Sequence, residues 1–237
     1  MLNIYDYLKD AVPDDHCRQT SALSVAETYI KNGFSPKKIV DLGCGTGSSA
    51  DHFKRLLPTS HWAGIDIEVS PEVLQRTRSD VEFLTFDGVN IPFIDSSVDF
   101  VYSNQVLEHV RHPEKLLKDV ARALSDSGKF IGQTSHLEPY HSYSLWNFTP
   151  YGFKTICEDA GLRLVELRPC IDGKTLCERS FANDKSSYNK WFSTESPMNF
   201  EIEEIARKEG TSNRAINIRK LLASGQFSFV CQRASAP

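Results

Sequence analysis

The sequence predicts an α/β fold, in which a doubly wound parallel sheet is covered by helices on both faces. Short apolar runs typical of buried strands alternate with helical patterns along most of the 237 residues. A loop with glycine at every second position follows the first of these runs, at residues 43–47. Acidic residues directly follow the next two runs, as functional residues do at the carboxyl ends of parallel strands.

Helices in the first half of the chain are expected where capping residues or proline bound a periodic pattern. Ser24 and Glu27 have the spacing of a capping box, and Asn32 and Gly33 close the same helix. Pro71 suits the first position of another helix. In chain order we expect a helix over 20–32, a strand over 38–42, a helix over 48–57, a strand over 61–65, a helix from residue 70 and a strand over 81–86.

The second half of the chain repeats the alternation of strands and helices. Residues 125–128 are expected to turn the chain into a strand at 129–133, and residues 170–225 are expected to contain helices at 200–209 and 212–222. Repeated pairs of this kind indicate a parallel sheet covered on both faces. The other elements expected here are strands over 98–102, 162–167 and 226–231 and helices over 113–124 and 150–160.

Composition and charge argue against several classes of protein. The net charge of −4 provides no basic field for nucleic acid. No apolar run approaches the roughly 20 residues that span a bilayer, and the amino terminus does not resemble a signal peptide. The six cysteines form no C-x-x-C pair, and the histidines and acids show no ligand spacing. We therefore expect a cytoplasmic protein with reduced thiols and no metal site, whose partners are neither nucleic acid nor membrane.

The strand, glycine loop and helix at residues 38–57 are typical of the nucleotide-binding corner of doubly wound folds. An NAD-dependent oxidoreductase is one interpretation, because residues 45–50 fit G-x-G-x-x-G/A and Asp66 lies about twenty residues further on. Asp41 argues against it. A carboxylate beside the loop would repel a pyrophosphate but attract a ligand that carries an ammonium and a sulfonium.

Several motifs in order resemble those of the class I S-adenosylmethionine-dependent methyltransferases. The chain looks most like the type 11 branch, which includes ubiquinone- and menaquinone-biosynthesis enzymes. The resemblance covers about residues 36–167. It rests on Val40–Gly47, Gly64–Ile67, Phe86–Gly88, and Ile91–Phe100 followed by Asn104–Val110.

The resemblance implies a Rossmann-like seven-stranded sheet whose last strand is antiparallel, with a mostly helical insertion before that strand. It divides the chain into three parts. These are an N-terminal helical segment (1–35), a methyltransferase domain (36–169 and 226–237), and an inserted substrate lid or oligomerisation segment (170–225). A homodimer through the inserted segment is an alternative to the lid.

The family pattern implies that the first strand tip holds the methionyl end of S-adenosyl-L-methionine. The backbone of Gly43, Cys44, Gly45 and Gly47 should pass that end of the cofactor. Asp41 should lie near its amino group.

The next strand tips are implied to hold the adenosine. Asp66 should accept hydrogen bonds from both ribose hydroxyls, with Ile67 against the adenine. Asp87 should accept the exocyclic amine of the adenine, with the Gly88 backbone beside the ring. The methionyl chain and the sulfonium should lie near two polar residues, Asn104 and Gln105.

Methyl transfer from a sulfonium needs mainly alignment of the acceptor, and a base helps only where the acceptor must lose a proton. Histidine suits that task because its pKa lies near neutrality. The candidate catalytic residues are His136, which follows a strand, then His109 and His141, with Glu138 as a further candidate. The alternative is a packing or helix-start role for His109 and an exposed loop position for His136 and His141.

The acceptor is expected to be a small molecule or a sugar-containing compound, methylated on oxygen. Residues 137–153 interleave aromatic and polar groups, which suits a ring-bearing acceptor, and they resemble methyltransferases of polysaccharide biosynthesis. Three alternatives remain open: an N- or C-methyltransferase, an oxidoreductase, and a non-catalytic methyltransferase-like module that binds a partner through residues 170–225.

Overall fold

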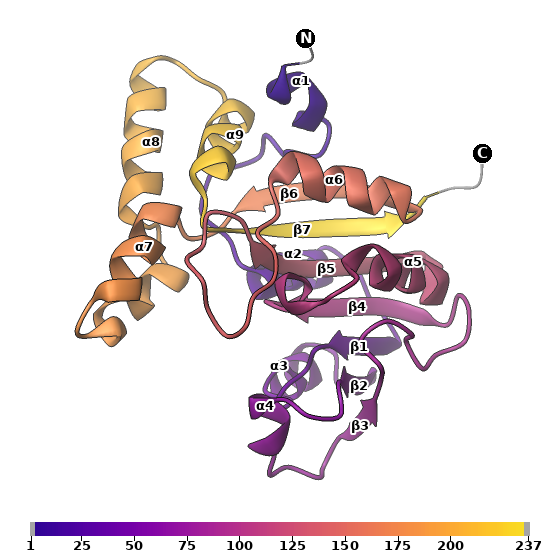
Figure 1. The fold of residues 1–237 in the computed structure, drawn as a ribbon. Coiled ribbons are helices and arrows are strands. Elements are labelled where there is room, and N and C mark those ends of the chain that lie inside the picture. Colours follow the sequence, from indigo (N-terminus) through magenta and orange to yellow (C-terminus); the bar gives the residue numbers. More distant parts are fainter. Residues whose placement is uncertain (1–2, 235–237) are drawn as a thin grey trace.

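A computed structural model describes residues 3–234 and contains a seven-stranded sheet (Figure 1). The strands are β1 (Lys38–Leu42), β2 (His61–Asp66), β3 (Glu82–Thr85), β4 (Val98–Asn104), β5 (Leu124–Ser135), β6 (Leu162–Pro169) and β7 (Gln226–Arg233). Their order across the sheet is β3-β2-β1-β4-β5-β7-β6, and β7 runs antiparallel to both of its neighbours. The predicted Rossmann-like sheet with an antiparallel last strand is therefore confirmed.

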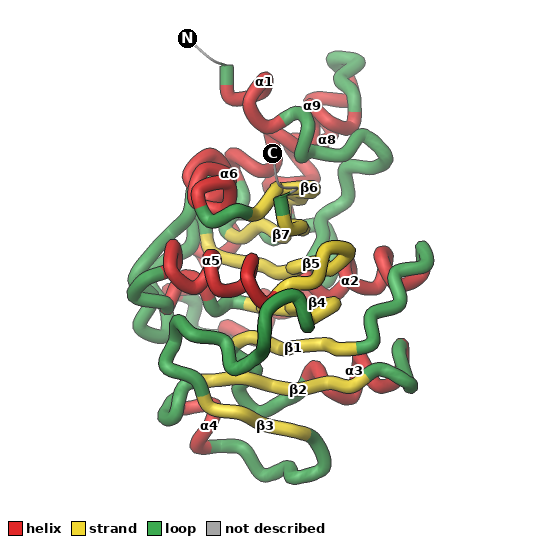
Figure 2. The backbone as a smooth tube through the Cα atoms, turned by 90° about the vertical axis from the view of Figure 1, so that its right-hand side faces the viewer, coloured by secondary structure: helices red, strands yellow, loops and turns green. Residues whose placement is uncertain are grey.

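Helices cover both faces of the sheet, with α5 and α6 on one face and α2 and α3 on the other (Figure 2). Further helices form the inserted segment, which lies beyond the carboxyl ends of β5 and β6 (Figure 1). The helices are α1 (Ile4–Leu8), α2 (Ala22–Lys31), α3 (Ser49–Leu56), α4 (Pro71–Leu74), η1 (Leu107–His109), α5 (Pro113–Ala123), α6 (Pro150–Asp159), α7 (Gly173–Phe181), η2 (Lys185–Phe192), α8 (Pro197–Lys208) and α9 (Asn213–Ala223).

Apolar residues pack in a separate core on each face of the sheet. On the face covered by α2 and α3, Phe53 meets Phe100 and Tyr102 edge to face, with ring centroids 5.3 and 5.0 Å apart. The central strand β1 is buried on both faces, as a parallel strand between two helical layers must be. Each large apolar side chain that is fully buried contributes roughly 1.5–3 kcal/mol.

Two local predictions were wrong. The capping box of α2 is formed by Ser21 and Ser24, not by Ser24 and Glu27, because the backbone at Ser21 is still extended and the helix begins at Ala22. Residues 125–128 belong to β5, which starts at Leu124 and pairs with Val98 before the register shifts. The short helices α1 and α7 were not predicted.

A buried lysine connects the inserted segment to the N-terminal part of the chain. Lys220 of α9 is fully buried, and its Nζ donates to the carbonyl of Cys17 at 2.7 Å. The same Nζ donates to Glu195 at 2.6 Å and to Glu203 of α8 at 2.7 Å. One ammonium group thus joins α9 to α8, to the segment before α8 and to the N-terminal part of the chain.

Replacing Lys220 by an apolar residue of similar length, which lacks the ammonium group, tests the connection. We expect Lys220→Met to lower the free energy of unfolding by about 2 kcal/mol, less than the 3–5 kcal/mol of a fully buried pair because both glutamates are partly exposed. Lys208→Met, on the exposed side of α8, should change it by less than about 0.5 kcal/mol. Equal urea midpoints for the two variants would refute the structural role of Lys220.

Candidate active site

The carboxyl ends of the parallel strands meet at one edge of the sheet, on the left in Figure 1. Leu42 at the end of β1 pairs with Ile65 of β2 and with Ser103 of β4. Asp66 pairs with Thr85 at the end of β3, and Asn104 pairs with Gln133 of β5. The register therefore brings the acidic and polar residues predicted from the sequence to the same edge.

The glycine loop follows β1 and is tied to the end of β2. The backbone N–H groups of Gly43 and Cys44 donate to the carbonyl of Ile65 at 2.8 and 3.2 Å. A Cβ on Gly43 would lie 2.4 Å from Val106 Cγ2, so a larger residue does not fit there. The three glycines of the loop have φ of +70°, +51° and +80°, which side chains disfavour: Gly43, Gly45 and Gly47.

Asp66 fixes the glycine loop and keeps hydrogen-bonding capacity for a ligand. Its Oδ2 accepts from the backbone N–H of Gly45 at 2.7 Å, and its Oδ1 accepts from that of Ile67 at 2.8 Å. A carboxylate has about four acceptor sites, so about two remain. The side chain is partly exposed, which fits the predicted contact with two ribose hydroxyls.

Asp41 is a buried carboxyl group under the same loop. It is 4% exposed, and its Oδ2 accepts from the Ser49 hydroxyl at 2.5 Å. Burial raises the pKa of Asp41 to about 7; the negative charge of Asp66 adds to the increase, and the hydrogen bond from Ser49 opposes it. Within residues 3–234 no lysine, arginine or histidine lies within 4.0 Å of Asp41. A ligand ammonium group would supply the missing positive charge.

A recess of about 570 Å³ lies at the tips of β2 and β3. Apolar surface from Ile67 and Val69, which are 43% and 64% exposed, borders it. A Cβ at Gly88 would meet only Ile67, at 3.8 Å, so the backbone there is open to a flat ring. The recess is lined by Ile67, Glu68, Val69, Thr85, Phe86 and Asp87.

The carboxylate of Asp87 lies at the edge of this recess and can accept hydrogen bonds. It accepts from the backbone N–H groups of Val89 and Asn90 at 2.8 and 2.6 Å and from the Asn90 side chain at 2.5 Å. The hydrogen bonds from Asn90 hold the pKa of Asp87 below its ordinary value. About one acceptor site remains, which fits the predicted adenine contact but also allows a purely structural turn.

Two arginines that sequence reasoning missed hold the carbonyls of the glycine loop. Arg76 donates to the Gly45 carbonyl at 3.0 and 2.7 Å, and its guanidinium stacks 3.8 Å from the centre of the Phe83 ring. Arg78 donates to the Gly47 carbonyl at 3.0 Å. No sequence signal identifies them, because their positions depend on how the segment after α4 folds back over the loop.

A second group of polar side chains lies beyond the tips of β4 and β5. We call it the EHH cluster: Glu108, His109 and His141, which offer ligand atoms within 4.8 Å of one another. Glu108 is fully buried, and the hydroxyls of Thr134 and Ser135 donate to its two oxygens at 2.9 and 3.1 Å. Burial raises the pKa of Glu108 to about 7. Glu108 was not among the predicted site residues.

Glu138 and Gln105 border the EHH cluster. The Ser135 hydroxyl shares its one proton between Glu108 and Glu138, whose oxygen lies 2.6 Å away, and Glu138 also accepts from Nε2 of Gln226 at 2.8 Å. The same Nε2 donates to Oε1 of Gln105 at 2.9 Å. Gln105 has a left-handed φ of +57°, and its own Nε2 is buried without a partner among the described residues. Asn104, one residue earlier, is exposed at the strand tip.

His136 lies apart from the other two candidate histidines. It is 8% exposed, and burial lowers its pKa. Hydrogen bonds to the backbone at Phe148 and Leu222 oppose part of that decrease. Its ring therefore connects the loop after β5 to α9, a position that favours a structural role.

The EHH cluster and the glycine loop are neighbours. Val106, at the start of the segment that carries Glu108 and His109, packs against Gly43. Glu72 of α4 lies against Gly45 and is close enough to His109 for its charge to raise the pKa of that histidine, although burial lowers it overall. A ligand in the loop would thus end beside the cluster.

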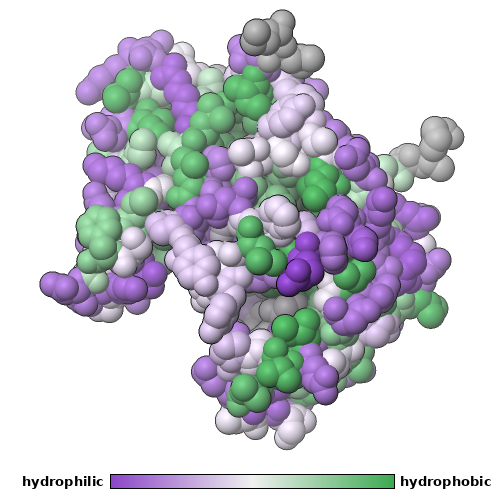
Figure 3. Space-filling view, in the orientation of Figure 1, coloured by the Kyte–Doolittle hydropathy of each residue, from purple (hydrophilic) through white to green (hydrophobic). Residues whose placement is uncertain are grey.

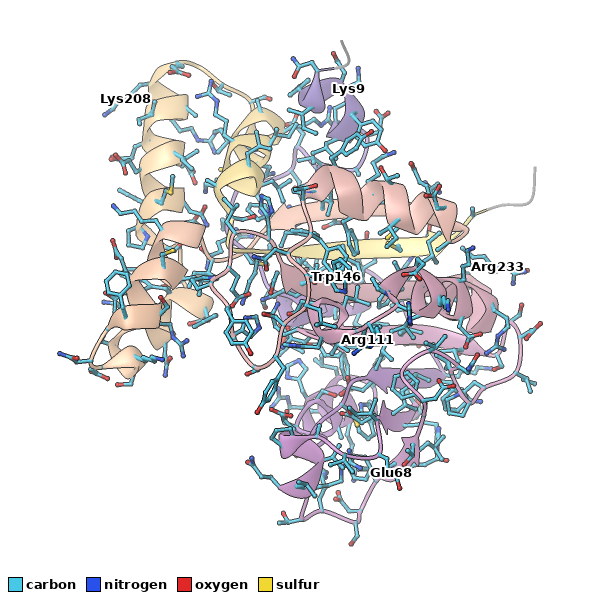
Figure 4. The ribbon with its side chains drawn as sticks, in the orientation of Figure 1. Lys9, Glu68, Arg111, Trp146, Lys208 and Arg233 are labelled. Atoms are coloured by element: carbon cyan, nitrogen blue, oxygen red, sulfur yellow. The ribbon has the colours of Figure 1, made fainter. Side chains whose placement is uncertain are left out.

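A further recess of about 470 Å³ opens on the other side of Glu138. It is lined by His136, Leu137, Glu138, Pro139, Asn147, Thr149 and Cys177. The loop over residues 137–149 crosses this region, and Trp146 on it donates from Nε1 to the carbonyl of Val110 at 2.8 Å (Figure 4). The space-filling view shows a notch between the part that carries α7 and the part that carries α4 (Figure 3).

Comparisons with known proteins agree with this arrangement. Residues 40–132 match the family model of a methyltransferase domain, type 11. A demethylmenaquinone methyltransferase from Paenarthrobacter aurescens is 28% identical over 56% of this chain and 51% of its own length. A malonyl-[acyl-carrier protein] O-methyltransferase from Bacillus cereus is 28% identical over 41% of this chain and 37% of its own. The chain thus spans about half or less of these relatives.

Solved structures share the fold at low identity. A putative methyltransferase in complex with the Trm112 methyltransferase activator from Haloferax volcanii aligns with a TM-score of 0.56 and 20% identity, over 86% of this chain and 84% of the other. No helix among the described residues has the length and apolar character needed to cross a membrane. Residues 40–132 are thus similar to a type 11 methyltransferase domain, and the strand order of the described residues is that of the Rossmann-like methyltransferase fold.

Proposed function

We propose that this protein transfers a methyl group from S-adenosylmethionine to a hydroxyl oxygen of a small-molecule or sugar-containing acceptor. One observation supports the part of the proposal that concerns the cofactor. Asp41 and Asp66 stand at neighbouring strand tips, coupled by their charges, with no cation of the described chain beside Asp41. Such a site favours a ligand with an ammonium and a sulfonium over one with a pyrophosphate.

The residues at the strand tips bind and orient the cofactor in this proposal. Asp66 accepts the ribose hydroxyls, Asp87 the adenine amine, and Ile67 covers the ring in the recess of β2 and β3. Asp41 pairs with the amino group beyond Gly43 and Cys44. The cofactor supplies the methyl group: the carbon–sulfur bond breaks as the carbon–oxygen bond forms, and the electron pair stays on sulfur.

The acceptor is proposed to enter from the recess beside Glu138 and to reach the EHH cluster. Exposed aromatic side chains of the 137–149 loop suit a sugar or another ring, since Tyr140, Tyr143 and Trp146 are 75%, 76% and 47% exposed. The hydroxyl proton would leave towards Glu138, which lines the acceptor recess and lies 3.8 Å from His141 of the EHH cluster. An O-methyltransferase stands among the relatives, beside N- and C-methyltransferases.

The inserted segment (170–225) is proposed to cover the acceptor or to form a homodimer. Apolar side chains stand exposed on it: Phe181, Phe200, Ile205 and Leu222 are 78%, 56%, 50% and 46% exposed. Sedimentation of the purified protein across a concentration series distinguishes the cover from the homodimer, because the average molecular mass rises with protein concentration only if the chain dimerises.

The cofactor assignment predicts a loss of affinity when Asp66 becomes neutral. We expect Asp66→Asn to weaken binding of S-adenosylhomocysteine by about 10–100-fold in calorimetry, because hydrogen bonds to a charged acceptor contribute roughly 1.5–3 kcal/mol. Asp126→Asn, whose side chain is 93% exposed, is the matched control. Stabilisation of the wild type by NAD but not by S-adenosylhomocysteine would support the oxidoreductase instead, and binding of no nucleoside would support the non-catalytic module.

The titration of Asp41 predicts how cofactor binding depends on pH. Only the ionised carboxylate pairs with an ammonium, and in the free protein its pKa is about 7. Affinity for S-adenosylhomocysteine should therefore fall by up to about tenfold per pH unit below about pH 7 and level off above about pH 8. 5′-Methylthioadenosine, which lacks the amino acid tail, should show no such dependence. Parallel pH profiles for the two ligands would contradict the pairing.

The titration of the Asp41 carboxyl also affects the stability of the ligand-free protein. The folded-state pKa of Asp41 lies above its ordinary value of 3.8, so the folded state loses stability as the pH rises from about 4 to 7. Asp41→Asn removes this loss and should raise the free energy of unfolding at pH 8, with a smaller effect at pH 5. Denaturant unfolding at both pH values measures the difference, and an equal effect at the two pH values would be inconsistent with a buried titrating carboxyl.

A further inference from the structure

We propose that the EHH cluster is a binding site for a divalent transition-metal cation. Two imidazoles and one carboxylate are a donor set that Zn²⁺ and its neighbours in the first transition series accept. The donors come from two segments, the η1 turn and the 137–149 loop, so their sequence spacing does not reveal them.

The two histidines each present a ring nitrogen that lacks a partner. Nδ1 of His109 and Nε2 of His141 are buried and accept or donate no hydrogen bond among the described residues. Buried polar atoms are nearly always paired, so two unpaired nitrogens at one place need an explanation. A cation between them would satisfy both.

The tautomer of His141 fits a metal ligand. Its Nδ1 donates to the carbonyl of Pro139 at 3.3 Å, which leaves a lone pair on Nε2. That Nε2 faces Oε1 of Glu108 at 4.0 Å. Histidines that bind metals commonly donate their other ring N–H to a carbonyl in this way.

The carboxylates of the region lack an adequate counter-charge. Glu108 is fully buried, and Glu138 is 10% exposed. Among the described residues His141 is the sole basic side chain within 4.0 Å of either glutamate. Two carboxylates in such a place are unfavourable without a cation nearby.

The geometry is close to that of a bound site. Ligand atoms of a tetrahedral Zn²⁺ site lie about 3.3 Å apart, from bonds of about 2.0–2.1 Å. The donors of the EHH cluster lie within 4.8 Å of one another, so movements of about 1 Å would complete the site. His141 sits on a loop, where such a movement is least costly.

The cation also gives the cluster a role in the reaction, and this part rests on the proposed methyl transfer. With three protein ligands, a further position remains for the oxygen of the acceptor. A bound cation lowers the pKa of that hydroxyl. The proton then passes to Glu138, which lines the acceptor recess, and the oxygen forms its bond to the methyl carbon as the carbon–sulfur bond breaks.

Titration of untagged, chelator-treated protein with Zn²⁺, and with Co²⁺ followed by visible absorption, tests the site. We expect one equivalent to bind, and Glu108→Gln, His109→Ala and His141→Ala each to weaken binding by more than about tenfold. Glu108→Gln can accept a hydrogen bond from one of the Thr134 and Ser135 hydroxyls and donate one to the other, so it should fold. His112→Ala, three residues from His109 and exposed beside Glu114, should bind like the wild type.

Binding of S-adenosylhomocysteine to the same metal-free samples separates this inference from the proposed function. Retained nucleoside binding shows that each variant is folded. No stoichiometric binding of either metal to the wild type would overturn the metal site while leaving the methyltransferase proposal intact. Equal metal binding by a His109→Ala/His141→Ala double variant would also overturn it, since the cation would then lie elsewhere.

Discussion

The negative charge at the ends of β1 and β2 is the constraint on which the rest of the site depends. Asp41 is buried under a loop whose backbone is tied to Asp66 and to the end of β2, so neither carboxylate can move away from the other. The fold maintains the repulsion between the two carboxylates because the strands that carry them are packed between two apolar cores. The loop carbonyls are in turn held by Arg76 and Arg78. The loop is thus fixed in place over the two carboxylates.

Much of the sheet could be predicted because each of its signals is local. The glycine loop, Asp66 and Asp87 each lie at or just after the end of the apolar run that carries them, and the register of a parallel sheet then gathers them at one edge. The strand boundaries differed mainly where polar residues such as Ser125 continue a strand. The helix α7, whose N-cap is Asp172, was also missed.

The EHH cluster could not be predicted, because it depends on how a loop folds back. The backbone N–H groups of Leu145 and Trp146 donate to the carbonyl of Glu108 at 2.7 and 3.1 Å. This places His141 beside a residue more than thirty positions earlier in the chain. Ser142 and Tyr143 have φ of +38° and +64°, a conformation that costs of order 1–3 kcal/mol for residues other than glycine. The contacts around the loop maintain this strained backbone conformation, and no sequence pattern predicts it.

The antiparallel strand β7 has a consequence for how the inserted segment can vary. The inserted segment leaves the sheet after β6 and returns to it at β7 on the same edge, and its two ends are joined by hydrogen bonds between Gly225 and Ile171 and by the bridge from Asp172 to Ser224. Because these contacts join the two ends of the inserted segment, changes within the segment are separated from the strands of the sheet. The inserted segment can therefore be exchanged, lengthened or deleted without disturbing the tips of β1, β2 and β3, which are proposed to bind the nucleoside.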